Sequence, residues 1–108
     1  MVETGTHAAE LARHIVGALV NGLSGRLVAV VLFGSRARGD ARPDSDYDIA
    51  VFLRDGVNLL EESRALAELE TDVLFDTGAI ITTIPFPAGA YARPTPLMQE
   101  IRREGRDL

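Results

Sequence analysis

The stretch that best indicates the fold reads Val31-Leu-Phe-Gly-Ser-Arg-Ala-Arg-Gly-Asp-Ala-Arg-Pro-Asp-Ser-Asp-Tyr-Asp-Ile-Ala-Val51. Two apolar runs flank a polar linker, which begins with Gly-Ser and ends with alternating aspartates. The runs predict two buried strands, and the glycine, proline and aspartates between them favour turns. Carboxylates at the start of a buried strand are costly, so Asp44, Asp46 and Asp48 need an explanation.

Hydrophobic periodicity outside this stretch predicts further helices and strands. In chain order, we expect a helix capped by Thr6, a strand at 27–33, a short helix at 35–38, a strand at 46–53, a helix at 59–77, a strand at 79–86 and a helix after Thr95. This order predicts a small α/β (α+β) fold in which helices pack against a mixed three-stranded sheet. We expect residues 1–108 to form one domain.

Composition excludes several classes of protein. The net charge of -5 argues against a general nucleic-acid binder, although Arg36, Arg38 and Arg42 form a local basic loop. The absence of cysteine excludes disulfides and thiolate metal sites. No segment has the length of a membrane span, and the N-terminus lacks the pattern of a signal peptide, so we expect a cytoplasmic protein.

Asp46 and Asp48 indicate a metal site. Residues two apart in a strand point to the same face, so the two carboxylates are expected side by side, where they repel each other. A bound cation relieves this repulsion, and hard oxygen ligands favour Mg²⁺ or Mn²⁺. Mg²⁺ typically takes one or two protein carboxylates and completes its shell with water and substrate phosphates. The pair therefore predicts half of a site for a metal and a nucleotide.

Gly34 and Ser35 predict the other half of this site. A glycine allows the backbone to approach a phosphate closely, and free amides at the start of a helix bind anions. The hydroxyl of Ser35 adds a donor, and Arg36 or Arg38 can add positive charge. We therefore expect these four residues to bind the phosphates of a nucleotide.

Other interpretations of the stretch are weaker. Gly34 and Gly39 have the glycine spacing of a P-loop, but the Lys-Ser/Thr that should follow is missing. The alternating aspartates imitate an EF-hand calcium loop, but Ile49 stands where that loop needs glycine. Aspartates that merely form a turn before a strand are common, and this interpretation suits Asp44.

The pattern of Gly-Ser, ten residues and Asp-x-Asp resembles the signature of the nucleotidyltransferase superfamily with the polymerase-β-like fold. In size and element order, the chain is most similar to the minimal nucleotidyltransferases (MNT). The resemblance implies that Gly34 and Ser35 hold a triphosphate and that Asp46 and Asp48 are the catalytic metal ligands. It also implies transfer of AMP from ATP to a hydroxyl. Minimal nucleotidyltransferases are commonly paired with HEPN toxins, and some adenylylate a tyrosine of that partner.

The chain departs from this family at the third strand. Family members normally carry a third carboxylate there, as general base, whereas this strand has Thr82 and Thr83 and no acid. Asp76, near the end of the preceding helix, is a candidate to reach the site instead. Two hypotheses follow. One is an enzyme whose acceptor lies on a HEPN-type partner or on another copy of the chain, as in a toxin–antitoxin pair. The other is a weak or inactive nucleotide-binding interaction module.

Overall fold

The computed structural model describes the backbone of residues 2–108 and the side chains of residues 8–108. The elements are, in order, α1 (Val2–Leu23), the 3₁₀ turn η1 (Ser24–Arg26), β1 (Leu27–Phe33), α2 (Ser35–Arg38), β2 (Tyr47–Leu53), α3 (Leu59–Thr77), β3 (Ile81–Pro87), the 3₁₀ turn η2 (Ala88–Ala92), α4 (Pro96–Glu104) and β4 (Arg106–Asp107). The predicted order is confirmed, but α1 begins at Val2, upstream of the predicted cap Thr6.

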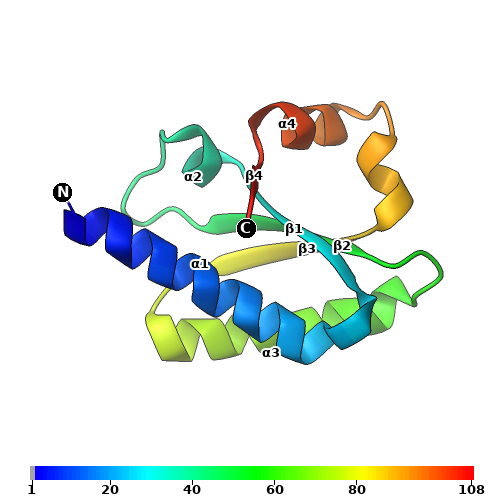
Figure 1. Ribbon diagram of the computed structural model, residues 1–108, viewed down its shortest axis with the longest axis horizontal. Coiled ribbons are helices and arrows are strands. Elements are labelled where there is room, and N and C mark those ends of the chain that lie inside the picture. The colour runs from blue at the N-terminus through cyan, green and yellow to red at the C-terminus, as the bar shows by residue number, and fades with distance from the viewer. Residues whose placement is uncertain (1) are drawn as a thin grey trace.

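The strands form one mixed sheet in the order β3-β2-β1-β4 (Figure 1). β1 is antiparallel to both β2 and β4, whereas β3 runs parallel to β2. The mixed sheet is as predicted, but the predicted count of three strands is wrong. Arg106 and Asp107 pair with Leu32 and Val31 of β1. A strand of two residues is too short to show a hydrophobic period, so only its long-range pairing reveals it.

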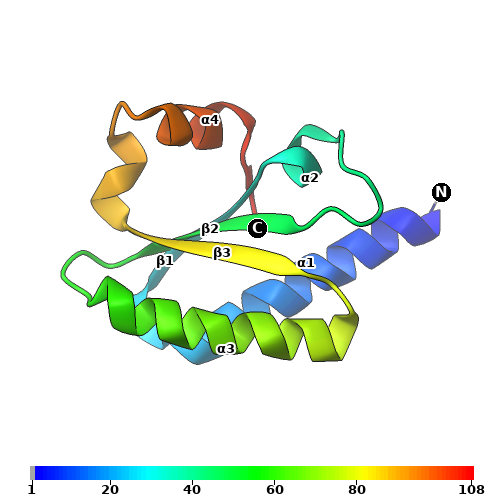
Figure 2. The same ribbon diagram turned by 180° about the vertical axis from the view of Figure 1, so that it is seen from behind.

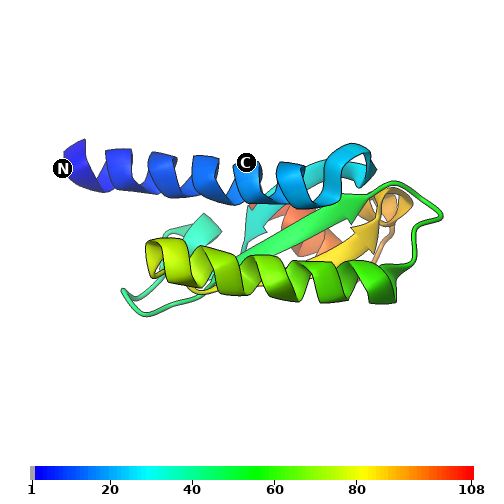
Figure 3. The ribbon, with the colours of Figure 1, turned by 90° about the horizontal axis from the view of Figure 1, so that it is seen from below.

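Helices cover both faces of the sheet. α1 and α3 lie side by side on one face (Figure 3), and α4 and η2 lie on the other. The side chains of β2 alternate between the two layers. Ile49, Val51 and Leu53 pack beneath α1 and α3, whereas Ala50 and Phe52 belong to the layer of α4. Consequently Asp48, two residues before Ala50, lies on the face that α4 partly covers.

Local signals account for the ends of two helices. Asn58 accepts hydrogen bonds from the amides of the first turn of α3, and Gly78, with φ of 77°, ends that helix at the predicted residue. Thr95 accepts a hydrogen bond from the amide of Met98, and Pro96 occupies the first turn of α4.

In the described part of the chain, no helix combines the length and hydrophobicity needed to cross a bilayer.

Candidate active site

Gly34 joins β1 to α2 and lies directly against Asp48. Its φ of 74° and ψ of -157° belong to a region of backbone space that is open essentially only to glycine. A Cβ atom added here would collide with Oδ2 of Asp48. The register explains the contact, because Phe33, the residue before Gly34, pairs with Asp48 across β1 and β2. Glycine is therefore required at position 34 for two reasons: the backbone conformation excludes other residues, and Asp48 leaves no room for a side chain.

The short helix α2 starts immediately after this glycine. The carbonyl of Gly34 accepts hydrogen bonds from the amides of Ala37 and Arg38, each at 3.1 Å. The amides of Ser35 and Arg36 precede these first bonds and are not needed by the helix. Ser35 is half-buried at the start of the turn. The turn thus leaves the amides of Ser35 and Arg36 outside the helix's own hydrogen bonds, and its phosphate binding stays a prediction.

Asp46, the residue before β2, and Asp48 in β2 both lie beside Thr82 of β3, as their spacing of two residues predicts. Asp46 is exposed, and its Oδ2 lies 3.4 Å from Oγ1 of Thr82, which donates a hydrogen bond to it. Asp48 is half-buried and stands in register with Thr82 of β3. Thr82 therefore occupies the position on the third strand that is closest to both carboxylates.

Burial raises the pKa of the Asp48 carboxyl above its ordinary value, and the negative charges of Asp46 and Glu100 raise it further. The positive charge of Arg38 opposes this rise. A crowded, partly desolvated carboxylate pair of this kind is stabilised by a cation. Among the described residues, no group of three or more His, Asp or Glu side chains is placed to hold a metal ion. Asp46 and Asp48 supply the one or two carboxylates that Mg²⁺ typically takes from a protein, so the two residues fit a cation whose other ligands are water and phosphate oxygens.

Arg36 is engaged by the linker that follows α2. Its Nη2 donates to the carbonyls of Ser45 at 2.8 Å and Pro43 at 3.1 Å, and its Nε donates to Ser45 at 3.2 Å. The guanidinium also lies 4.3 Å from the centre of the Tyr47 ring. These contacts fix the linker that leads into Asp46. In this structure Arg36 is thus a positioning residue, and direct contact with a phosphate would require it to leave these partners.

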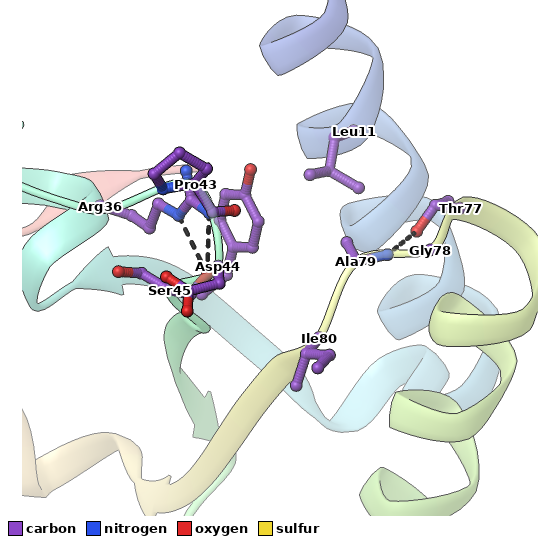
Figure 4. Close-up of a pocket in the computed structure, with 10 residues that line it drawn as sticks. Leu11, Arg36, Pro43, Asp44, Ser45, Thr77, Gly78, Ala79 and Ile80 are labelled. Carbon is purple, nitrogen blue, oxygen red and sulfur yellow. Dashed lines mark hydrogen bonds between the residues drawn. The ribbon is translucent and has the colours of Figure 1, made fainter.

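A pocket of about 280 Å³ lies beside Arg36, between the linker and the turn from α3 to β3 (Figure 4). Leu11 of α1, Tyr47 and Ile80 are among its lining residues. Tyr47 points to the opposite face of β2 from its neighbours Asp46 and Asp48. The pocket is therefore separated from the carboxylates by the backbone of β2.

Arg38 lies at the C-terminal end of α2 and is exposed. Its Nε lies 3.3 Å from Oδ2 of Asp40, and its Nη1 lies 3.6 Å from Oε2 of Glu104 in α4. Because its charge also acts on Asp48, Arg38 is near enough to the carboxylate pair to influence it. Of the two arginines predicted to bind phosphate, Arg38 is the exposed one, and its side chain is held by ion pairs with Asp40 and the half-buried Glu104.

The other acids considered from the sequence lie elsewhere. Asp76 belongs to α3, on the opposite face of the sheet, and its Oδ2 lies 3.5 Å from Nε2 of His14 in α1. Asp76 therefore does not reach the site, and that suggestion was wrong. Thr83 also faces this layer, and its amide and hydroxyl both donate to Glu70 of α3, at 2.7 and 2.8 Å. The helix that carries these acids covers the face without Asp46 and Asp48.

Glu100 is a residue near the site that sequence reasoning missed. It lies on α4, is half-buried, and its negative charge raises the pKa of Asp48 and contributes to the raised pKa of Arg38. Its position depends on how α4 packs over β1 and β2. No short-range pattern in the sequence links a residue so late in the chain to the Asp-x-Asp pair, so only the tertiary structure indicates it.

The glycine turn, the strand carboxylates and the mixed sheet together define a nucleotidyltransferase-type domain. The family profile described as Polymerase beta, Nucleotidyltransferase matches residues 21–108. The chain therefore belongs to this nucleotidyltransferase family, as the resemblance of its motif implied. No functionally curated protein matches the chain.

Solved structures extend this similarity. A minimal nucleotidyltransferase is 26% identical, with a TM-score of 0.63 over 94% of this chain and 95% of that chain. A toxin–antitoxin crystal structure with AMP-PNP is 23% identical, with a TM-score of 0.65 over 88% of this chain and 69% of that one. A complex of a tri-AMPylated Shewanella oneidensis HEPN toxin with its MNT antitoxin is 20% identical, with a TM-score of 0.60 over 94% and 70%. The fold is thus that of the minimal nucleotidyltransferases.

Proposed function

We propose that the protein transfers AMP from ATP, with Mg²⁺ or Mn²⁺ bound, to a hydroxyl group. The observation that carries this proposal is the contact between Gly34 and Asp48, which a Cβ atom would abolish. It brings a turn suited to phosphates against a carboxylate suited to a cation. A surface turn with no ligand has no need of this close approach.

In this proposal, Asp46 and Asp48 hold the cation, which neutralises charge on the phosphates when bound. The hydroxyl of Ser35 and the free amides of the turn orient the β- and γ-phosphates. Arg38 adds positive charge after exchanging its ion-pair partners. The acceptor hydroxyl gives its proton to water as its oxygen bonds to the α-phosphorus, the bond from that phosphorus to the bridging oxygen breaks, and pyrophosphate leaves with that electron pair.

We further propose that the acceptor is a tyrosine of a HEPN-type protein and that the pair acts as a cytoplasmic toxin–antitoxin system. Two observations on similar structures support this partner. One neighbour is a toxin–antitoxin complex with AMP-PNP, and in another the HEPN toxin is AMPylated. Residues 1–108 would act as one domain, with an acceptor on the partner or on another copy of the chain.

Calorimetry tests the site. Wild-type protein should bind ATP in the presence of Mg²⁺, and the double variant Asp46→Asn/Asp48→Asn should bind at least about 100-fold more weakly, a loss of roughly 3 kcal/mol. Asp72→Asn is the matched control, because Asp72 is exposed on α3, on the other face. Equal Mg²⁺-dependent binding by the double variant and the wild type would contradict the proposal.

A second candidate function is a nucleotide-binding interaction module that transfers little or no AMP. The observation that favours it is Thr82, a hydroxyl where β3 stands in register with Asp48. Incubation with ATP labelled at the α-phosphate and a HEPN-type protein separates the two functions. Labelled partner supports the transferase, whereas tight Mg²⁺-dependent binding without label supports the module.

A further inference from the structure

The side chain of Asp46 has few contacts that fix its position. It is exposed, and its one hydrogen bond in the described structure is the 3.4 Å contact with Oγ1 of Thr82. In the proposed function, on which this inference rests, the carboxylate must stay beside Asp48 so that both bind the cation. The position of Asp46 therefore depends on the backbone that leads into β2.

That backbone belongs to the linker that loops out between α2 and β2 (Figure 2). Residues 42–45 close a turn, in which the amide of Ser45 donates to the carbonyl of Arg42 at 3.0 Å and the amide of Arg42 donates to Oγ of Ser45 at 2.9 Å. In the part of the chain that the structure describes, the hydrogen bonds between residues 41–45 and other elements all come from Arg36. This side chain thus anchors the turn to α2.

Arg36 also contacts both sequence neighbours of Asp46. Its guanidinium donates twice to the carbonyl of Ser45, at 2.8 and 3.2 Å (Figure 4), and lies 4.3 Å from the centre of the Tyr47 ring. Because Tyr47 points to the opposite face of β2 from Asp46, the guanidinium holds the backbone from the side away from the cation site. One side chain therefore fixes the backbone on both sides of Asp46, from the face opposite its carboxylate.

Cavities adjoin Arg36 and Tyr47 on that opposite face. Both residues line the 280 Å³ pocket and also an apolar cavity of about 530 Å³ between α1 and the sheet. Close-packed side chains would hold the linker even without the guanidinium, whereas open cavities allow it to shift. The position of the linker therefore depends on the contacts of Arg36 more than on packing.

We propose that Arg36 is the positioning residue of the cation site: it sets the affinity for Mg²⁺ through the backbone around Asp46, and it keeps these contacts when ATP is bound. The sequence predicted instead that Arg36 contacts a phosphate. A phosphate contact requires positive charge, whereas the positioning role requires the planar guanidinium, which donates from two nitrogens and stacks on a ring. Arg36→Lys therefore separates the two roles, because it keeps the charge and removes the guanidinium.

NMR of isotope-labelled protein tests the proposal, with Mg²⁺ added first without nucleotide and then with ATP. The amide shifts of Asp46 and Asp48 measure the affinity for Mg²⁺. For Arg36→Lys we expect this affinity to fall about tenfold, as is typical when a residue that orients a metal ligand is removed. Amide hydrogen exchange at residues 41–46 should become faster, while exchange in β2 and Tm stay unchanged. ATP affinity at saturating Mg²⁺ should remain within about threefold of the wild-type value.

Tyr47 offers an independent variant of the same contact. Tyr47→Leu removes the ring beneath the guanidinium and should lower the Mg²⁺ affinity, and Tyr47→Phe, which restores a ring, should recover it. Arg36→Lys combined with Tyr47→Leu should lose less affinity than the product of the single losses, because both changes disrupt one contact. Arg64→Lys is the matched control, since Arg64 is exposed on α3, and it should leave the Mg²⁺ affinity unchanged.

The outcomes distinguish this proposal from the proposed function. If the wild type binds Mg²⁺ and Arg36→Lys binds it equally well, Arg36 does not position the cation site, and the proposed function stands. If Arg36→Gln weakens ATP binding at saturating Mg²⁺ far more than Arg36→Lys does, Arg36 is a phosphate contact, which also overturns the proposal. Faster exchange throughout the protein or a lower Tm in Arg36→Lys would overturn it too, because Arg36 would then support the whole fold. If the wild type shows no Mg²⁺-dependent shift with or without ATP, the proposed function itself fails.

Discussion

The two faces of the sheet differ in what they bury. The face beneath α1 and α3 is closed by apolar side chains, and its buried acid, Glu62, accepts a hydrogen bond from Arg26. The face beneath α4 is only partly covered, and it carries Asp46 and Asp48 beside the glycine turn. Strand β2 contributes to both faces through alternate residues.

The two faces thus have different roles: side chains on the closed face stabilise the fold, and side chains on the other face form the candidate active site. On the closed face Glu62 is paired with Arg26, and Glu70 accepts hydrogen bonds from Thr83, since an unpaired buried charge would be costly. On the other face Asp46 and Asp48 lie close enough for their charges to repel, and among residues 8–108 no cationic side chain forms an ion pair with either, a cost that a bound cation would remove. Variants on each face should therefore affect different properties.

The largest effect on stability is expected from Ile49→Ala on the closed face. Ile49 is 0% exposed, so its truncation leaves a cavity and should lower the free energy of unfolding by about 2–5 kcal/mol. Ile84→Ala is the matched change on the other face, where the side chain is only half-buried, and it should cost less. Urea denaturation measures both. Equal losses of unfolding free energy in the two variants would contradict the difference in burial between the two faces.

Gly34→Ala should have a smaller effect on stability, of roughly 1–3 kcal/mol, because alanine is strained in this backbone conformation. Its Cβ also displaces Asp48, so Mg²⁺-dependent ATP affinity should fall at least about tenfold. Gly39→Ala is the control, since Gly39 also has a positive φ, of 86°, but has no atom within 4 Å of an added Cβ. That variant should lose stability but keep its affinity in calorimetry, and parallel losses of affinity would contradict the proposed contact.

The smallest effect is expected from Asp48→Asn, and it is a gain in stability. Because the folded state raises the pKa of Asp48 above that of the unfolded chain, the folded protein binds a proton more readily. This carboxylate therefore lowers stability as pH rises through its titration range, and the cost persists at neutral pH. Asparagine removes that cost, so Tm at pH 7.5 should rise, by a small amount because solvent screens this partly exposed group.

Differential scanning calorimetry between pH 4 and 7.5 checks this sign, because the difference between variant and wild type should shrink toward acidic pH. Asp72→Asn, at an exposed position on α3, should leave Tm unchanged. A lower Tm for Asp48→Asn at neutral pH would show that the ionised carboxylate stabilises the protein without ligand. That result would contradict the destabilising effect proposed for ionised Asp48.

Much of the fold could be predicted because its signals are local. The bounds of α3 follow from its periodicity and from Gly78, and the start of α4 follows from Thr95 and Pro96. The shared face of Asp46 and Asp48 follows from the period of a strand. The role of Arg36 could not be predicted in the same way, because its partners are backbone carbonyls of a linker whose path is irregular.

The sequence by itself determined the order of the elements, the glycine turn and the common side of the two aspartates at the start of β2. The tertiary structure decided which groups surround them. It placed Thr82 in register with Asp48, put Asp76 on the far face, added β4 beside β1, and packed α4 over the layer of Ala50 and Phe52. The physical reason is that turns and strand faces depend on neighbouring residues, whereas register and helix packing depend on contacts between distant parts of the chain.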